Sequence, residues 1–137
     1  MYNKAKRIIY TGLFIEKNSF YNLFPAKLAK EIEYPHVTVF FKPKGSEVHQ
    51  ELFGEKATIT VTGYGCDEKN EGFSVKINAQ NPELQKLCDG ILVPHITISV
   101  SEDGKPVDTG KLEFETREQV SIEATFGAFT TGGLILR

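Results

Sequence analysis

One six-residue pattern occurs twice in the chain, as YPHVTV at 34–39 and as VPHITI at 93–98. Both copies place Pro, His and Thr at the same offsets, and the other positions hold apolar or aromatic residues. In a β-strand, residues i and i+2 point to the same face, about 6.6 Å apart, and residue i+1 points to the other face. Each copy therefore predicts a strand with an apolar face for a core and a polar face that carries His and Thr. Because proline is tolerated at the first position of a strand, each histidine is expected where its strand begins.

The repeat sets two of the three histidines apart from the third. The first copy contains His36 and Thr38, and the second contains His95 and Thr97. His49 has no hydroxyl residue at that offset and is interpreted as a solvated helix histidine. A single His-x-Thr is a weak signal, but two copies in one frame favour a shared role. The alternative is a pair of half-buried structural histidines in a duplicated fold, although duplication needs to preserve only the apolar faces.

The remaining sequence predicts strands interspersed with short helices. Runs rich in β-branched and aromatic residues predict strands at 7–16, 36–42, 57–65, 72–79 and 95–100, and two more around the Thr-Thr-Gly-Gly turn in the tail at 120–137. Helices are expected at 25–32, 46–53 and 82–92, each starting with proline or serine, and a loop is expected at 18–22. This order predicts an α+β fold with antiparallel sheets and helices outside. A length of 137 residues, 40% of them hydrophobic, favours a single domain over 1–137.

Charge and hydropathy argue against several classes of function. The formal net charge is −2 and the sequence pI is about 5.9, so no broad basic surface for duplex DNA is expected, and a nucleic-acid ligand would be small or held locally. No apolar run approaches the roughly 20 residues that a membrane span needs. The N-terminal residues lack the apolar stretch of a signal peptide, so a cytoplasmic location is expected. Cys66 and Cys88 lack metal-site spacing and are expected to be reduced thiols.

Two histidines and two threonines facing one cleft would form a compact catalytic set. Near neutral pH one imidazole can accept a proton while the other donates one, which is general acid–base catalysis. The hydroxyls of Thr38 and Thr97 can donate hydrogen bonds to the non-bridging oxygens of an anion. The substrate that fits this arrangement is a phosphodiester. No carboxylate cluster or third ligand accompanies the histidines in sequence, so no metal and no cofactor are expected.

These motifs resemble those of a known superfamily. PHVTVFFKP at 35–43 and PHITISV at 94–100 resemble the paired His-x-Thr motifs of the two-histidine (2H) phosphoesterases, which have a bilobal, pseudo-twofold fold. Three further stretches are similar to the branch that contains the cyclic phosphodiesterase domain of fungal tRNA ligases and related RNA-repair-like proteins: VTGYGCDEKNEGFSVKI (61–77), GKPVDTGKL (104–112) and FGAFTTGGLI (126–135). The resemblance implies two antiparallel sheets that face a central cleft, with helices outside.

The resemblance also implies a reaction and its residues. His36 and His95 would be the catalytic pair, and Thr38 and Thr97 would bind the phosphate. The reaction implied is hydrolysis of a 2′,3′-cyclic phosphate on a ribonucleoside or RNA end. The product that the resemblance implies is a 2′-phosphate. One histidine would activate water while the other protonates the departing ribose oxygen, and the sequence leaves open which is which. A monomer that acts on a nucleotide or RNA terminus is expected.

Two other residues and two other functions stay open from the sequence. Tyr10 could stack on a base or pack in the core, and Lys42, on the strand face of His36, could meet phosphate or lie in solvent. One alternative function keeps the chemistry but changes the substrate to 2′-5′, 3′-5′ or cyclic oligonucleotides. The other is a nucleotide-binding or RNA-end-binding module without turnover. Retention of both histidines argues against the module, because Lys, Arg or hydroxyls would suffice for binding.

Overall fold

The computed structural model describes residues 7–137. The described strands join in one antiparallel sheet with the order β2-β6-β5-β4-β7-β1-β3, and β8 pairs with β7. The strands are β1 (Ile8–Phe14), β2 (Lys30–Glu31), β3 (His36–Phe41), β4 (Lys56–Cys66), β5 (Asn70–Ala79), β6 (His95–Val100), β7 (Glu115–Thr130) and β8 (Gly133–Ile135). The helices are α1 (Lys17–Leu23) and α2 (Pro82–Asp89), with the short 3-10 helices η1 (Gly45–Glu47), η2 (Gln50–Leu52) and η3 (Pro106–Lys111). The predicted α+β class is confirmed.

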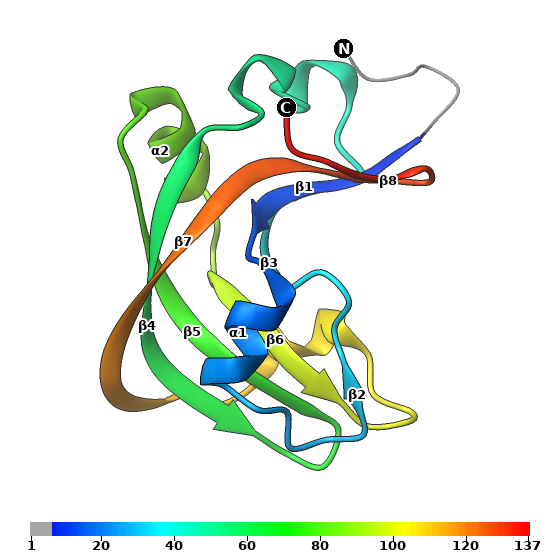
Figure 1. Ribbon diagram of the computed structural model, residues 1–137, viewed down its shortest axis with the longest axis vertical. Helices are drawn as coiled ribbons and strands as arrows, with labels where there is room; N and C mark the ends of the chain where they lie inside the picture. The colour runs from blue at the N-terminus through cyan, green and yellow to red at the C-terminus, as the bar shows by residue number, and fades with distance from the viewer. Residues whose placement is uncertain (1–6) are drawn as a thin grey trace.

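The sheet is strongly curved, so the strands near its two ends come close together. β4 and β7, with 11 and 16 residues, run along the molecule, while β1 and β3 lie toward one end and β6 and β2 toward the other (Figure 1). Residues of β3 and β6 approach within 8 Å, Cα to Cα. Because β4 and β7 connect the strands at one end of the molecule to those at the other, the sheet is continuous. The predicted division into two facing sheets and two lobes is not confirmed.

Alternation along the strands decides which side chains are buried. In β4, Ile59 and Val61 are fully buried, and the residues between the buried positions are half-buried or exposed. Three buried rings join this core from different elements: Phe20 from α1, Phe73 from β5 and Phe126 from β7. The core thus connects α1 to the sheet and fixes the strands that carry the two motifs.

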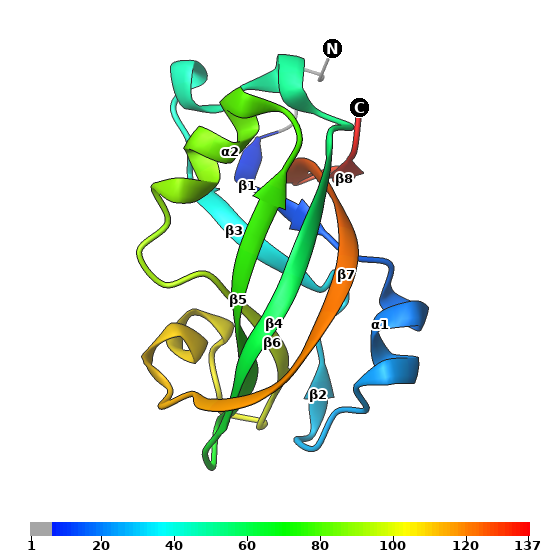
Figure 2. The ribbon, with the colours of Figure 1, turned by 90° about the vertical axis from the view of Figure 1, so that its left-hand side faces the viewer.

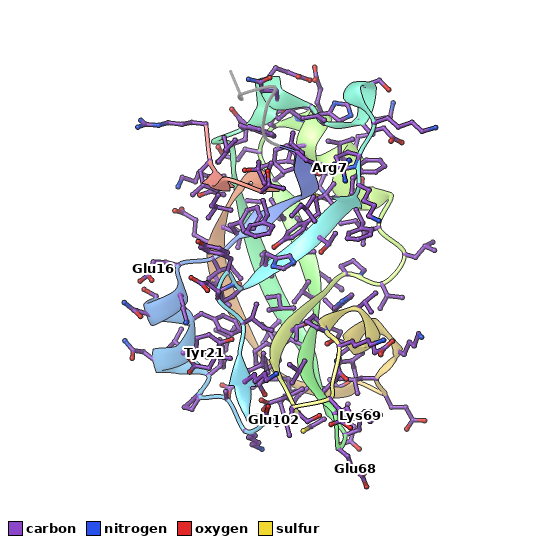
Figure 3. All side chains as sticks on the ribbon, turned by 90° about the vertical axis from the view of Figure 1, so that its right-hand side faces the viewer. Arg7, Glu16, Tyr21, Glu68, Lys69 and Glu102 are labelled. Atoms are coloured by element: carbon purple, nitrogen blue, oxygen red, sulfur yellow. The ribbon has the colours of Figure 1, made fainter. Side chains whose placement is uncertain are left out.

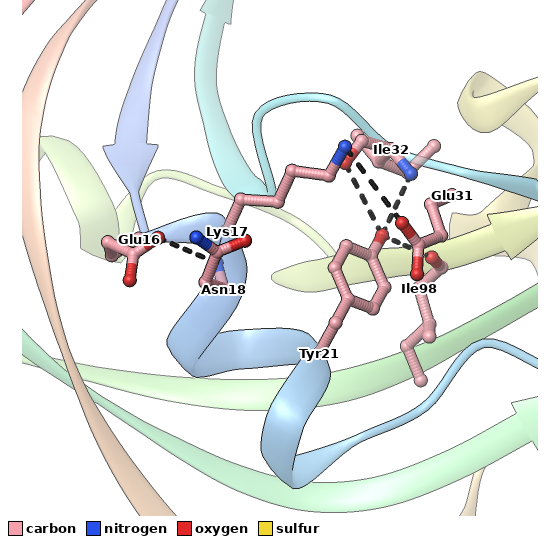
Figure 4. A network of polar contacts seen from close by, with 7 residues as sticks. All are labelled: Glu16, Lys17, Asn18, Tyr21, Glu31, Ile32 and Ile98. Carbon is pink, nitrogen blue, oxygen red and sulfur yellow. Dashed lines mark hydrogen bonds and ion pairs between the residues drawn. The ribbon is translucent and has the colours of Figure 1, made fainter.

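Helix α1 contains the residues predicted as a loop at 18–22. The Glu16 carboxylate caps it by accepting from two backbone amides of the first turn. Phe20 is fully buried, and the Tyr21 hydroxyl donates to the carbonyl of Ile98 in β6 at 2.6 Å. Figure 4 shows the Tyr21 side chain reaching from α1 to β6. The polar composition favoured a loop, and contacts with a distant strand stabilise a helix instead.

The predicted helix at 25–32 is wrong, because this segment contains no helix and forms β2 at Lys30–Glu31. Side chains distant in sequence bind its backbone: Glu71 Oε1 accepts from the Lys27 amide at 3.0 Å, and Ser99 Oγ accepts from the Leu28 amide at 3.1 Å. Two residues further on, Lys30–Glu31 pairs with β6. The backbone groups that a helix would have satisfied internally therefore find partners in the sheet.

The predicted helix at 46–53 is divided into η1 and η2 by His49. This histidine has a left-handed backbone with φ of 54°, which does not continue a helix. Its side chain is half-buried, and Nδ1 lies 3.5 Å from the Glu51 carboxylate. The interpretation of His49 as a solvated helix histidine is therefore wrong.

The remaining predicted elements are found close to their expected positions. Helix α2 begins after Asn81, whose side chain accepts from two amides of the first turn, and Gly90 ends it. The two tail strands are β7 and β8, and β7 begins earlier than predicted, at Glu115. Among residues 7–137, no helix is long and apolar enough to cross a membrane.

The turn after β6 is joined to the turn between β4 and β5. The Ser101 amide donates to the Lys69 carbonyl at 2.9 Å. Figure 3 shows Glu68, Lys69 and Glu102 together at one end of the molecule, far from Arg7 at the other. The chain then forms η3, which lies beside β5 and β6 (Figure 2).

Candidate active site

His36 is the first residue of β3, and both of its ring nitrogens have partners. Nδ1 lies 2.7 Å from the carbonyl oxygen of Tyr34, and Nε2 lies 3.1 Å from Oγ1 of Thr38. A carbonyl oxygen can only accept, so the proton of the neutral ring is on Nδ1 and Nε2 is the basic nitrogen. The ring also stacks on Tyr10, with the two centroids 4.5 Å apart.

His95 is the first residue of β6 and has an equivalent anchor. Its Nδ1 lies 2.7 Å from the carbonyl oxygen of Val93, which again directs the proton to Nδ1. Within the described part of the chain, its Nε2 makes no hydrogen bond, so this nitrogen is available to a ligand. Gly110 of η3 packs on the ring, because a Cβ atom at that position would lie 3.0 Å from the ring Cε1.

The two prolines are placed alike as well. The Pro35 carbonyl accepts from the Ile15 amide at 2.9 Å, and the Pro94 carbonyl accepts from the Val75 amide at 3.1 Å. In both copies, the carbonyl of the residue before proline accepts from the histidine, and the carbonyl of the proline accepts from a backbone amide of a neighbouring segment. The sequence repeat is therefore a repeat of local geometry that includes the residues on either side of proline.

The two histidines are near enough to interact electrostatically. Burial lowers the pKa of His36 to about 4, the hydrogen bond to the Tyr34 carbonyl partly opposes this, and positive charge on His95 lowers the pKa further. His36 is therefore neutral at pH 7 in the free protein. A negatively charged ligand between the rings would raise this pKa, because it would stabilise the imidazolium.

The two threonines differ in their surroundings. Thr38 is half-buried, and in the part of the chain that the structure describes its hydroxyl contacts only His36. Thr97 is 7% exposed, and its Oγ1 lies 2.8 Å from Oγ1 of Thr109 and 3.3 Å from the carbonyl oxygen of Pro106. The Nδ1 anchors of the two histidines are equivalent, but the surroundings of the threonines beside them are not.

Tyr10 contacts His36, whereas among the described residues Lys42 contacts neither histidine. The Tyr10 hydroxyl is 3.3 Å from His36 Nδ1, and burial raises the pKa of this phenol to about 12, so it is neutral. Lys42 follows β3, is exposed and lies with Nζ 5.4 Å from the centroid of the Phe41 ring. No described contact joins Lys42 to either histidine, and a role in binding stays a prediction for both residues.

Other residues around the pair were not identified from the sequence. Phe14 lies with its ring centroid 5.6 Å from that of His36, and Phe129 stacks on Tyr10 at 5.5 Å. The neighbours of Thr97 come from η3, within the stretch 104–112 that carries the sequence resemblance. That resemblance was the only signal for η3, because its contacts depend on the fold.

Neither cysteine takes part in a disulfide. Cys66 is exposed and Cys88 is buried, and both are free, as predicted. Among residues 7–137, no three side chains of His, Cys, Asp or Glu are grouped as metal ligands.

The chain matches no family model and no curated protein. Membership of the two-histidine superfamily therefore stays a prediction.

Proposed function

We propose that the protein is a metal-independent phosphodiesterase that hydrolyses 2′,3′-cyclic phosphates of ribonucleosides or RNA ends. The observation that carries the proposal is the equivalent anchoring of His36 and His95. Each ring bonds a carbonyl two residues earlier through Nδ1, at 2.7 Å, and each presents Nε2 for proton transfer. Their electrostatic interaction supports a common substrate site between β3 and β6.

The proposed reaction exchanges one phosphorus–oxygen bond for another. Nε2 of one histidine takes a proton from water, and the water oxygen forms a bond to phosphorus. The bond from phosphorus to a ribose oxygen breaks, and Nε2 of the other, protonated histidine donates a proton to that oxygen. Departure of the 3′ oxygen leaves a 2′-phosphate. The matching Nδ1 anchors are compatible with either direction of proton transfer.

The Thr38 hydroxyl is suited to bind a non-bridging oxygen of the phosphate. Its contact with His36 Nε2, at 3.1 Å, would be exchanged for contacts of both groups with the substrate. The rings of Tyr10 and Phe14 lie against the His36 ring and provide aromatic faces near the reacting groups. We extend the proposal to a pseudo-twofold relation between the β1–β3 and β5–β6 pairs, in a monomeric cytoplasmic protein.

The test is turnover by the purified protein in EDTA. The substrates are nucleoside 2′,3′-cyclic phosphates, an RNA with a cyclic phosphate end and a 2′-5′ dinucleotide, and ³¹P NMR identifies the product isomer. We expect a 2′-phosphate product from the cyclic substrates, with activity lost in His36→Gln and His95→Gln and kept in the control His49→Gln. Loss of activity in EDTA would contradict the metal-independent mechanism. Cleavage of the dinucleotide alone would favour the nuclease, and binding without turnover would favour the module.

A further inference from the structure

The 3-10 helix η3 forms one side of the His95 half of the site. Gly110 lies against the His95 ring, and Thr109, the residue before it, is fully buried. The Thr109 methyl group packs on Gly72 of β5 so closely that a Cβ atom on Gly72 would collide with it. The close approach of η3 to β5 and β6 (Figure 2) thus holds Thr109 next to Thr97.

Asn70, Thr109 and Thr97 form a continuous chain of buried hydrogen-bonding groups. Asn70 Nδ2 donates to the Lys105 carbonyl at 2.7 Å and to Thr109 Oγ1 at 3.0 Å. Thr109 Oγ1 lies 2.8 Å from Thr97 Oγ1. Asn70 is 3% exposed and Thr97 is 7% exposed, so water does not replace these partners easily.

This series of hydrogen bonds has a direction, because the side-chain amide nitrogen of Asn70 can only donate. Thr109 Oγ1 accepts from Asn70 and has one proton of its own. In the free protein, the Thr97 proton points to Thr109 Oγ1 or to the Pro106 carbonyl. When an anion accepts the Thr97 proton, the Thr109 hydroxyl can rotate and donate its proton to Thr97 Oγ1. The order of donation is then from Asn70 to Thr109, to Thr97 and to the anion.

We propose that Asn70 and Thr109 are positioning residues that orient and polarise the Thr97 hydroxyl toward the substrate phosphate. Each hydrogen bond in such a chain strengthens the next, so Thr97 becomes a better donor than an isolated hydroxyl. Thr38 has no comparable support in the described chain, where its hydroxyl contacts only His36. The two halves of the site therefore bind the phosphate differently. This inference rests on the proposed phosphodiesterase function.

A double-mutant cycle on kcat/KM tests whether Thr109 acts through Thr97. The variants are Thr97→Val, Thr109→Val and the double variant, with a nucleoside 2′,3′-cyclic phosphate as substrate. We expect a loss of about 10- to 100-fold for Thr97→Val and of about 3- to 10-fold for Thr109→Val. The double variant should be no less active than Thr97→Val alone, because Thr109 has no partner to support once the Thr97 hydroxyl is gone. We call the hydrogen-bonded series Asn70, Thr109 and Thr97 the relay. If the loss of kcat/KM in the double variant equals the product of the two single losses, the relay is contradicted.

Two further variants separate the relay from simple damage to the fold. Thr109→Ser keeps the hydroxyl and should retain activity within about threefold of the unsubstituted protein. Thr130→Val removes a buried hydroxyl that donates to the Gly133 carbonyl at 2.8 Å and should leave kcat/KM unchanged. If Thr109→Val does not fold, the comparison of Thr109→Ala with Thr109→Ser takes its place in the cycle. Equal loss in the alanine and serine variants would also overturn the relay.

Failure of the relay is distinguishable from failure of the proposed function. An unsubstituted protein that turns over none of the substrates contradicts the phosphodiesterase and, with it, the relay. An active protein whose Thr109→Val variant has unchanged kcat/KM contradicts the relay alone. A second readout is competitive inhibition by inorganic phosphate, whose inhibition constant should rise in Thr97→Val and Thr109→Val by similar factors. An unchanged constant in both variants would show that the relay does not act on the phosphate.

Discussion

Burial of His36 should make the stability of the protein depend on pH over a defined range. The pKa of this histidine falls from its ordinary value of 6.5 to about 4, chiefly because the charged ring is poorly solvated beneath Tyr10 and Phe14. The unfolded chain binds a proton at His36 between pH 6.5 and pH 4, and the folded protein does not. The free energy of unfolding therefore decreases as pH falls through this range, and the contribution of His36 levels off below pH 4.

The difference in pKa sets the size of this effect. Each pKa unit corresponds to about 1.4 kcal/mol, so the fall from 6.5 to about 4 corresponds to roughly 3 kcal/mol in total. Most of that loss occurs above pH 4.5. Against a typical unfolding free energy of about 5–15 kcal/mol, a loss of this size is easily measured by urea denaturation.

The assay compares the unsubstituted protein with His36→Gln between pH 7 and pH 4.5. Over this range the unfolding free energy of the unsubstituted protein should fall by about 2–3 kcal/mol more than that of His36→Gln, because only the unsubstituted protein has the half-buried imidazole. His49→Gln is the control and should keep the pH dependence. NMR titration of the ring protons gives the pKa directly, and inorganic phosphate should raise it. A His36 pKa near 6.5, or parallel pH profiles for the two proteins, would refute the reasoning.

Three other substitutions test particular contacts. Thr11 Oγ1 is fully buried without a hydrogen-bond partner among the described residues, so Thr11→Val should raise the unfolding free energy by about 1–3 kcal/mol, and a loss of stability would contradict this. Gly110→Ala should press on the His95 ring and lower kcat severalfold at unchanged stability, whereas Gly45→Ala, with open space around its Cβ, should leave kcat unchanged. Glu71 is 2% exposed and accepts from three donors, so Glu71→Gln should cost about 1–3 kcal/mol in thermal or urea denaturation; equal stability would show that this network is dispensable.

The sequence predicts those parts of the fold that depend on local pattern. Alternation and β-branched residues identify the long strands, and Asn81-Pro82 identifies the start of α2, because these signals lie within the elements themselves. The segments at 18–22 and 25–32 were predicted wrongly for the opposite reason. Their structure depends on Phe20, which is buried in the core, and on Glu71, which binds the Lys27 amide from a strand more than forty residues later.

The candidate site shows the same division between local and distant contacts. The strands that begin at His36 and His95 follow directly from the repeated sequence. The support of Thr97 by Asn70 and Thr109 does not follow, because Asn70 begins β5 and Thr109 follows β6, both in segments with no periodic pattern. Asn70 stands as the first residue of β5, where its polar type looks like part of a turn. Only the fold brings its amide to the buried hydroxyl.

The role of proline in the repeat changes how the motif is understood. The residue before a proline favours an extended backbone, and in both copies the carbonyl of that residue binds Nδ1 of the following histidine at 2.7 Å. Proline has no N–H to donate in the sheet, yet the carbonyls of Pro35 and Pro94 both accept from a backbone amide of a neighbouring segment. The unit that sets the histidine tautomer is therefore X-Pro-His, and the threonine is a separate addition. Repetition of X-Pro-His explains why the two Nδ1 anchors are equivalent, and the threonine in each copy has different partners.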